Sequence, residues 1–353
     1  FLMVEEIMKK YGYFNFFRDS PINDNIGRIT FVSKENYLVM TPKGELIGKL
    51  KGRYSYEIED AKEFPYVGDW VSIQYTGNEK EVLIDHLFRR KNRISRKMRG
   101  KQFSEQIIAC NVDYIIFCMS TDENFSLRLL EKYLYAFSCP NSKSLLVLTK
   151  KDLAENVEKN IKKIKELYPN LEVIATSIYE DSSIKLLLPY LLEGTTSVII
   201  GSSGVGKSTL INHIAGKEIF KTREISKKTQ RGKHTTTFRK LIYLGEGLGC
   251  IIDTPGLSSV SLWSSYNSNS AFSDIEELSL HCKFRNCTHT VEKGCAVLKG
   301  VKDGIISEDR YKNFIKLKRE ENFMKSKIDF NINKKRNKEI EEREKMKKSK
   351  KRK

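Results

Sequence analysis

The sequence lacks any run of about 18 consecutive apolar residues, so we expect no membrane-spanning helix. Its first residues also lack the basic-then-apolar pattern of a secretory leader, because Glu5 and Glu6 stand where such a leader carries positive charge. Cysteine occurs seven times, an odd number that does not suit a framework of disulfides. Together these absences favour a cytoplasmic protein in a reducing compartment, where clustered cysteines are more often metal ligands.

Acidic residues are missing from residues 88–101, which carry eight basic side chains. Residues 326–353 carry thirteen basic and five acidic side chains. The two segments hold 16 of the 18 net positive charges, so the rest of the chain is close to neutral. Such concentrated charge suits the phosphates of a nucleic acid. A solvated linker and a disordered tail are the alternative that charge alone leaves open.

The first part of the chain indicates a small β domain. A length of 353 residues with 39% hydrophobic residues allows two or three domains. After an aromatic-rich N-terminal extension at 1–25, residues 26–87 show five short β runs separated by turns. This pattern predicts an OB-fold barrel. An SH3-like barrel is the alternative, because the number of strands does not separate the two folds.

The rest of the chain predicts an α/β domain followed by helices. A basic linker at 88–104 leads into residues 105–265, where buried strands alternate with helices, one of them expected over 184–192. Such alternation is typical of a mostly parallel sheet covered by helices. Residues 270–325 show a helical pattern that contains cysteines, and we expect a zinc-binding domain there. The Lys-rich tail at 326–353 is expected to be disordered or a lone charged helix.

A phosphate-binding loop is the strongest single motif. From Gly201 the chain reads Gly-Ser-Ser-Gly-Val-Gly-Lys-Ser, after an apolar strand and before a helix, which is the context that this loop requires. We expect Lys207 to reach the β- and γ-phosphates and Ser208 to bind Mg²⁺. The nucleotide contacts predicted in this stretch are Gly201, Ser202, Ser203, Gly204, Val205, Gly206, Lys207, Ser208 and Thr209. The loop alone does not distinguish ATP from GTP.

Guanine is indicated by a base-reading motif, Thr149-Lys150-Lys151-Asp152. The Asp152 carboxylate can accept two hydrogen bonds from guanine that adenine does not offer. Lys150 would lie along the base, and Ser177 would brace the base through its backbone. The usual first residue is Asn, so we expect Thr149 to leave about 1 kcal/mol of hydrogen bonding unmade. The motif precedes the phosphate loop, whereas it ordinarily stands near the end of a guanine-nucleotide switch, so the domain is predicted to be circularly permuted.

A third motif begins at Asp253 and reads Asp-Thr-Pro-Gly. Asp253 would hold Mg²⁺ through water, and the Gly256 N–H would sense the γ-phosphate. The next residue, Leu257, stands where many switches have a Gln that orients water, which an apolar side chain cannot do. We expect His234 to orient or deprotonate the attacking water, with support of its own loop as the alternative role. Thr236, chosen from several adjacent threonines, would complete the Mg²⁺ shell.

A metal site is predicted from four residues within a span of 14: Cys282, Cys287, His289 and Cys295. Three thiolates and one imidazole match the ligand set of structural Zn²⁺, which is tetrahedral and closed. His281, beside the first cysteine, is a competing ligand. Since four protein ligands leave no open position, we expect the metal to be structural rather than catalytic.

Taken together, these motifs resemble the circularly permuted, small-ribosomal-subunit-dependent GTPases, the RsgA (YjeQ/EngC) family, over roughly residues 26–320. Further stretches carry the resemblance: Gly68-Asp69-Trp70-Val71, the segment from Glu105 to Asp113, and Gly232-Lys233-His234-Thr235-Thr236. Thr149 and the Lys-rich tail depart from the family pattern.

The resemblance implies a late factor in maturation of the 30S ribosomal subunit. Such a factor binds 16S rRNA near the decoding region, and it leaves when the subunit stimulates hydrolysis of GTP to GDP. The cofactors implied are Mg²⁺ with GTP and one structural Zn²⁺, and we expect a monomer. The alternative is a nucleotide-gated RNA-binding protein without significant turnover, and a nucleotide-dependent metabolic enzyme is a more distant one.

Overall fold

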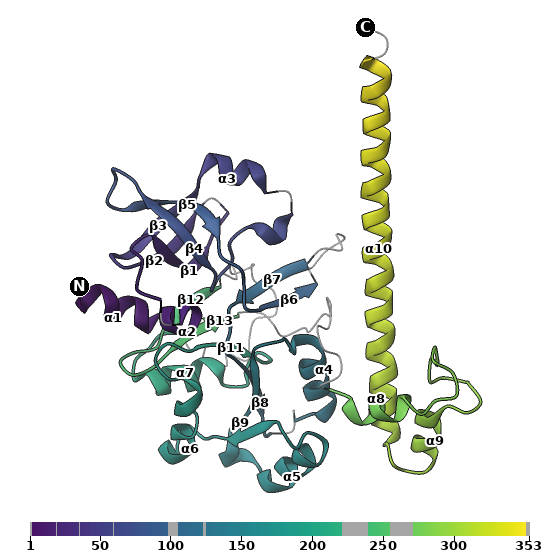
Figure 1. The fold of residues 1–353 in the computed structure, drawn as a ribbon. Coiled ribbons are helices and arrows are strands. Elements are labelled where there is room, and N and C mark those ends of the chain that lie inside the picture. Colours follow the sequence, from purple (N-terminus) through teal and green to yellow (C-terminus); the bar gives the residue numbers. More distant parts are fainter. Residues whose placement is uncertain are drawn as a thin grey trace, which may run out of the picture. The chain divides into compact units, whose positions relative to one another are not determined.

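The chain folds into two compact units in the computed structural model (Figure 1). The residues described are 2–18, 20–34, 36–58, 60–97, 105–122, 125–220, 239–254 and 271–350. The first unit comprises Phe1–Ile94, Ile107–Tyr133 and Phe137–Val260, and the second comprises Ser95–Gln106, Leu134–Ala136 and Ser261–Lys353. Among the described helices, none is both long and apolar enough to cross a membrane.

A closed five-stranded barrel forms the first part of unit one. Its strands are β1 (Ile26–Val32), β2 (Tyr37–Thr41), β3 (Gly44–Leu50), β4 (Trp70–Tyr75) and β5 (Glu81–Leu87). They pair in the order β1-β2-β3-β5-β4, and β4 returns to β1. The β3–β5 pairing is parallel, whereas the other pairings are antiparallel. This Greek-key closure confirms the OB-fold prediction and is not that of the SH3-like alternative.

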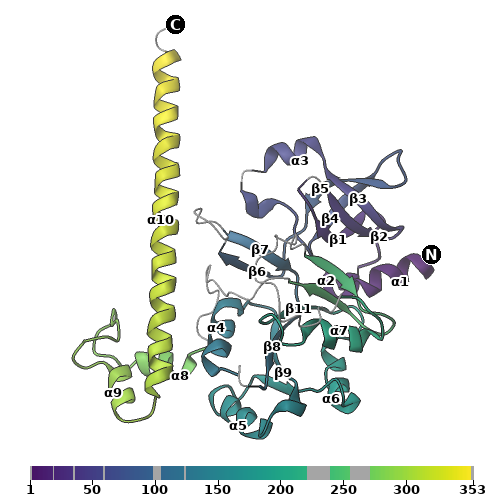
Figure 2. The ribbon, with the colours of Figure 1, turned by 180° about the vertical axis from the view of Figure 1, so that it is seen from behind.

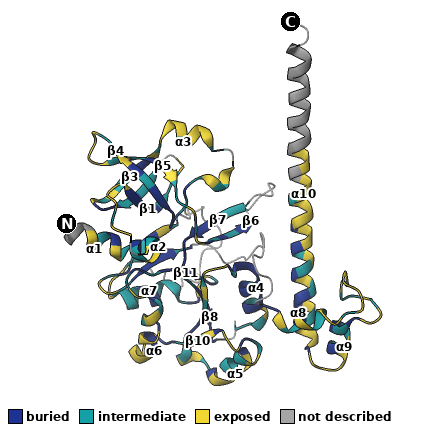
Figure 3. Cartoon of the chain, in the orientation of Figure 1, coloured by how far each residue is buried: buried dark blue, intermediate teal, exposed yellow. Residues whose placement is uncertain are grey.

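Alternation of side chains along the strands fills the barrel with apolar residues. The core residues are Ile29, Val39, Val71, Ile73, Val82 and Ile84. The connection from β3 to β4 carries the helix α3 (Gly52–Glu57), which has no buried residue, and the short 3-10 helix η1 (Ala61–Glu63). Figure 3 shows this contrast between buried strands and the exposed α3.

A six-stranded α/β sheet forms the second part of unit one. Its strands are β8 (Tyr114–Ser120), β9 (Lys143–Thr149), β10 (Glu172–Ala175), β11 (Thr196–Ile200), β12 (Lys240–Tyr243) and β13 (Cys250–Asp253). The order is β10-β9-β8-β11-β13-β12, and only β12 is antiparallel to its neighbour β13. This arrangement confirms the predicted mostly parallel sheet. Figure 2 shows β11 leading to α7 in this sheet.

The helices of this part are α4 (Leu127–Phe137), α5 (Val157–Leu167), α6 (Asp181–Lys185) and α7 (Lys207–Ala215). The helix expected over 184–192 is wrong in extent. The α-helix α6 ends at Lys185, and the 3-10 helix η3 (Leu188–Tyr190) follows it. Pro189 explains the break, because proline lacks the N–H that a continuing helix needs.

Barrel and sheet are joined by a buried polar cluster. The Asp69 carboxylate is fully buried and accepts a hydrogen bond from Arg90, with Nη2 and Oδ2 2.7 Å apart. Asn111 donates to the Gly68 carbonyl at 3.0 Å, and Arg28 donates to the same carbonyl at 3.3 Å. Buried groups of this kind are costly when unpaired, so the cluster favours one arrangement of barrel and sheet.

The segment predicted to be a basic linker contains structure. It includes β6 (Arg93–Lys97), which pairs with β7 (Glu105–Cys110). Arg90 forms the buried ion pair with Asp69, and the buried Arg96 donates to Gln106 Oε1 at 2.9 Å. Some of the basic side chains that we expected to bind a nucleic acid therefore make contacts within the protein instead.

Two helices at the N-terminus pack on both parts of unit one: α1 (Leu2–Lys10) and α2 (Tyr13–Phe17). On the barrel side, the rings of Tyr13 and Trp70 meet edge-on with centroids 5.7 Å apart. On the sheet side, Asn15 donates to the Gly194 carbonyl at 2.8 Å, just before β11. The extension is thus a folded strap across unit one.

The second unit contains α8 (Ser273–Ser279), α9 (Ala296–Lys302) and the long α10 (Glu308–Lys350). Arg310 of α10 is 5% exposed and binds Asp274 of α8 through two hydrogen bonds of 2.9 and 2.6 Å. Its guanidinium also lies over the Phe272 ring, 4.9 Å from the centroid. Helix α10 continues into residues 326–350, so the tail is helical there, as the second of the two predicted alternatives had it.

The packing of this N-terminal strap on unit one can be tested at Gly12, which links its two helices. Gly12 has φ +84°, and a Cβ placed there would lie 2.5 Å from the Gly194 carbonyl oxygen. We expect Gly12→Ala to lower the free energy of unfolding by about 1–3 kcal/mol, because it adds backbone strain and a clash. Gly52→Ala, where nothing lies within 4 Å, is the control and should be neutral or slightly stabilising. Equal urea midpoints for the two variants would contradict a tightly packed strap.

Candidate functional site

The phosphate loop lies where the sequence predicted it, between β11 and α7. Gly201 must be glycine, because a Cβ there would lie 2.4 Å from the Cys118 carbonyl oxygen of β8. Gly206 has φ +95°, a left-handed conformation that directs the chain into α7. The loop therefore opens onto the N-terminus of α7, where backbone N–H groups favour an anion.

Two half-buried charged groups, Lys207 and Asp253, lie at this loop. The Lys207 ammonium lies 2.8 Å from the Gly201 carbonyl oxygen and 2.6 Å from that of Ser202. Burial lowers the pKa of Lys207, and burial raises the pKa of Asp253 at the end of β13. Each charge is thus disfavoured by its surroundings, and a triphosphate with a divalent cation would supply the counter-charges that the two groups need.

The predicted base reader lies beside the loop, at the ends of β9 and β10. The Ser177 hydroxyl donates to Asp152 Oδ1 at 2.6 Å and so fixes the orientation of the carboxylate. Lys150 adopts φ +58°, and its ammonium pairs with Asp122 Oδ2 at 3.0 Å. The second lysine of the motif, Lys151, pairs with Glu180 at 3.0 Å and points to the surface.

One detail of the base reader differs from expectation. The Ser177 N–H, expected to brace the base, donates instead to Ser183 Oγ at 3.1 Å. The Thr149 hydroxyl lies 2.5 Å from the Val205 carbonyl oxygen, and the loss of one hydrogen bond relative to Asn stays a prediction. Within the described part of the chain, the next N–H along, that of Ile178, donates no hydrogen bond.

Sequence reasoning missed two residues of this site. Asp122 holds Lys150, and Tyr133 of α4 places its hydroxyl 3.2 Å from Ser202 Oγ in the phosphate loop. Asp122 could have been found, because it follows β8, and the carboxyl ends of parallel strands meet at one edge of a sheet. Tyr133 left no such signal, since its helical position predicts only a core aromatic residue.

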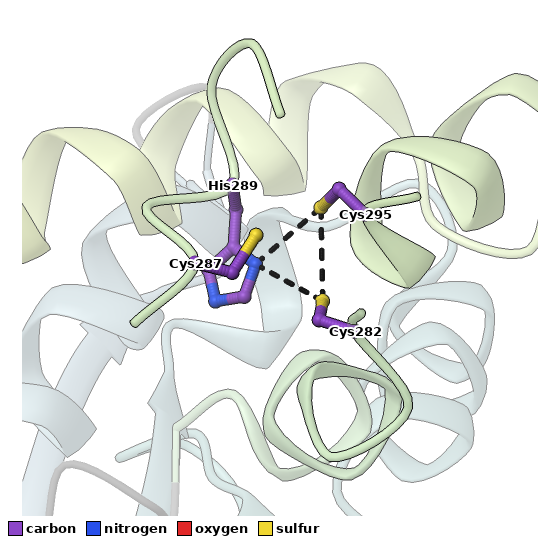
Figure 4. A group of neighbouring side chains, drawn as sticks. All are labelled: Cys282, Cys287, His289 and Cys295. Carbon is purple, nitrogen blue, oxygen red and sulfur yellow. Dashed lines mark hydrogen bonds between the residues drawn. The ribbon is translucent and has the colours of Figure 1, made fainter. Parts of the chain in front are cut away.

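The four predicted metal ligands come together in the second unit (Figure 4). Their ligand atoms all lie within 4.8 Å of one another, and His281 is outside the group. His289 Nδ1 is 3.6 Å from Cys282 Sγ and 3.5 Å from Cys295 Sγ. Backbone N–H groups at the start of α9 point at two of the sulfurs, from Ala296 to Cys282 and from Leu298 to Cys295. The donor set and its spacing fit a tetrahedral ion such as Zn²⁺.

Three predicted site residues, His234, Thr236 and Gly256, lie outside the described residues. Their roles therefore remain predictions. The strands on either side of them are described, since β12 begins at Lys240 and β13 ends at Asp253.

Comparisons with known proteins agree with this geometry. A family model described as RsgA GTPase matches residues 87–263, and one described as 50S ribosome-binding GTPase matches residues 196–334. The second match begins at the strand before the phosphate loop and leaves out the base reader, as expected when that motif stands upstream of the loop.

Named relatives cover most of the chain. The small ribosomal subunit biogenesis GTPase RsgA 2 of Lactiplantibacillus plantarum is 36% identical over 295 residues, which are 84% of this chain and 83% of the relative. The corresponding RsgA 1 of Listeria innocua is 36% identical over 317 residues, 89% of each. The chain belongs to the RsgA GTPase family. It is therefore a GTP hydrolase. This answers the question, left open by the phosphate loop alone, of whether the nucleotide is ATP or GTP.

Solved structures share the fold. The crystal structure of YjeQ from Thermotoga maritima aligns with a TM-score of 0.61 at 24% identity, covering 84% of this chain and 98% of that one. YloQ, described as a circularly permuted GTPase, aligns with a TM-score of 0.58 at 26% identity, covering 87% and 99%. These alignments confirm the permuted phosphate-loop fold of this RsgA-family GTPase.

Loss of the Ser177 hydroxyl should weaken guanine recognition. We expect Ser177→Ala to raise the Kd for GDP about fivefold, the equivalent of about 1 kcal/mol, because Asp152 is no longer held in place. Ser182→Ala is a matched control, since this exposed hydroxyl bonds only to the surface residue Glu180, at 3.2 Å. Titration calorimetry with GDP measures both, and an unchanged Kd for Ser177→Ala would show that Asp152 needs no such support.

Proposed function

We propose that this GTPase acts in late maturation of the small (30S) ribosomal subunit. It binds 16S rRNA while GTP is bound, and it leaves when the subunit stimulates hydrolysis. The observation that carries the proposal is the agreement between the relatives' names and the build of the chain. In the sequence, an OB barrel precedes the predicted nucleotide motifs and a Cys3His cluster follows them, and both modules are common in RNA-binding proteins.

The nucleotide site suits GTP in detail. Asp152 would accept hydrogen bonds from the N1–H and the amino group of guanine. Because the Ser177 N–H is already bonded to Ser183, the N–H of the next residue, Ile178, would donate to the carbonyl of the base. Lys207 would bind the β- and γ-phosphates, and Gly256 would sense the γ-phosphate. Mg²⁺ held by Ser208 and Thr236, and through water by Asp253, would neutralise the charge of the phosphates.

Water activation falls to His234 in this proposal. Leu257 offers no polar group in the place of the usual Gln. An imidazole can orient or deprotonate water, and its loop would be brought into place by the ribosomal subunit. The proposal therefore predicts that GTP hydrolysis is slow on the isolated protein and fast on the ribosomal subunit.

Contacts with rRNA would combine phosphate neutralisation with stacking of bases. Tyr56 on α3 is 91% exposed, which suits stacking on an unpaired base. The basic segment around residues 88–101, apart from its buried arginines, and the Lys-rich end of α10 would contact phosphates. We infer a monomer that works in the cytoplasm, where ribosomal subunits mature.

The proposal predicts GTP hydrolysis that is stimulated by purified 30S subunits and weakens as salt is raised, because phosphate contacts release counterions. Turnover is measured as phosphate release at low and raised salt, with 50S subunits as the control. His234→Ala should keep GTP affinity and lose stimulated turnover by about 100-fold. Tight GTP binding with no stimulation would leave a nucleotide-gated RNA-binding protein, and equal turnover of the variant would remove His234 from the mechanism.

Zinc removal should affect the second unit and spare the nucleotide site. We expect one Zn²⁺ per chain, because the four ligands already lie close together. A chelator should lower the helical signal in circular dichroism and change the Kd for GDP less than twofold. Cys287→Ser should lose zinc, whereas Cys139→Ser, a buried cysteine outside the cluster, should keep it. A purified protein without zinc, or one whose GDP binding is lost with it, would contradict a purely structural ion.

A further inference from the structure

Tyr179 is an exposed aromatic residue beside the base reader. It stands in the turn that follows β10, two residues after Ser177, and it is 83% exposed. Within the described part of unit one, Tyr56 on α3 is the only other exposed aromatic residue. The Tyr179 ring therefore offers a ligand apolar surface that is not used inside the protein.

The backbone around Tyr179 is held in place. The Ser177 hydroxyl accepts a hydrogen bond from the Tyr179 N–H at 3.2 Å and donates to Asp152 Oδ1 at 2.6 Å. The Glu180 N–H closes the turn on the Ser177 carbonyl at 3.1 Å, and the Glu180 carboxylate pairs with Lys151 at 3.0 Å. One hydroxyl thus connects the base-reading carboxylate with the residue that carries the ring.

The side chain of Tyr179, in contrast, is free. In the described part of the chain, its hydroxyl has no hydrogen-bond partner, and its ring has no aromatic or cationic neighbour. A ring on a fixed turn needs little further ordering when a ligand arrives, because the backbone is already in place and only two side-chain torsions remain. The turn is thus suited to a ligand that the neighbouring carboxylate binds.

We propose that the Tyr179 ring stacks on the guanine base that Asp152 binds. Hydrogen bonds to Asp152 engage one edge of the base and leave its faces open. An aromatic side chain covers such a face, and this contact strengthens binding of a base whatever its edge carries. The inference rests on the guanine contacts proposed for Asp152. It gives Tyr179 the role of raising affinity, and it leaves the selection of guanine to Asp152.

Stacking can be distinguished from mere support of the turn by a second nucleotide. Inosine diphosphate presents the same faces as GDP but lacks the amino group that Asp152 would bind. Loss of a stacked ring should therefore weaken both nucleotides by the same factor. Loss of a support for the turn would instead displace Asp152 and weaken GDP more than inosine diphosphate.

The test uses the full-length chain with three variants at Tyr179 and one control. Tyr179→Ala removes the ring, Tyr179→Phe keeps it without the hydroxyl, and Tyr179→Trp places an indole there whose fluorescence is quenched by stacking on guanine. Leu186→Ala is the matched control, because it shortens another exposed apolar side chain of the α/β part, one that is 57% exposed. Calorimetry gives the Kd for GDP and for inosine diphosphate.

We expect Tyr179→Ala to weaken binding of both nucleotides by the same factor, about tenfold. Tyr179→Phe and Leu186→Ala should stay within twofold of the parent. In stimulated GTP hydrolysis Tyr179→Ala should raise KM and keep kcat, since the ring contacts no reacting phosphate. Fluorescence of Tyr179→Trp should fall on addition of GDP by more than that of the parent.

Two results would overturn the stacking. One is an unchanged Kd for GDP in Tyr179→Ala, and weaker binding of that variant to 30S subunits would then assign the ring to rRNA. The other is a larger loss for GDP than for inosine diphosphate, because the ring would then act through Asp152.

The proposed guanine site and this inference fail in different ways. A parent protein that binds ADP as tightly as GDP would overturn the role of Asp152 and the guanine site with it. A guanine-selective parent whose Tyr179→Ala variant binds GDP equally well would overturn only the stacking by Tyr179.

Discussion

The burial of one carboxylate, that of Asp69, constrains how the barrel meets the sheet in the first unit. Asp69 is fully buried immediately before β4, and a charge in that place is tolerated only with partners. Arg90 and Asn111, which supply them, come from the segment that leads out of the barrel and into the sheet. Barrel, connecting segment and sheet are therefore fixed to one another by the same set of hydrogen bonds.

The nucleotide site depends on this sheet rather than on the order of its motifs. β8, β9, β11 and β13 are parallel neighbours, so their carboxyl ends bring together Asp122, Thr149, the loop after Ile200 and Asp253. A ligand that binds at the carboxyl ends of strands is indifferent to which loop the chain reaches first. Circular permutation moves the termini and leaves the set of neighbouring strand ends in place.

The sequence was sufficient wherever function resides in adjacent residues. The phosphate loop and the four metal ligands follow from spacing alone, and the structure brings both sets together. The sequence was insufficient to predict contacts between residues that lie far apart along the chain. Charge counting could not show that Arg96 is buried or that Arg90 pairs with the buried Asp69. The motif Thr149-Lys150-Lys151-Asp152 could not show that Thr149 reaches Val205, 56 residues on. Pro189, in contrast, was visible and should have shortened the expected helix.

The position of β12 gives the barrel a direct connection to the nucleotide site. Lys240 pairs with Asp253 on one side and with Phe31 of barrel strand β1 on the other. Its ammonium also approaches Glu45 of β3 at 3.9 Å. The Mg²⁺ residue proposed here is therefore separated from the barrel by a single strand. If Asp253 is displaced, either Lys240 and the barrel move with it, or the strand pairing from β13 through β12 to β1 breaks.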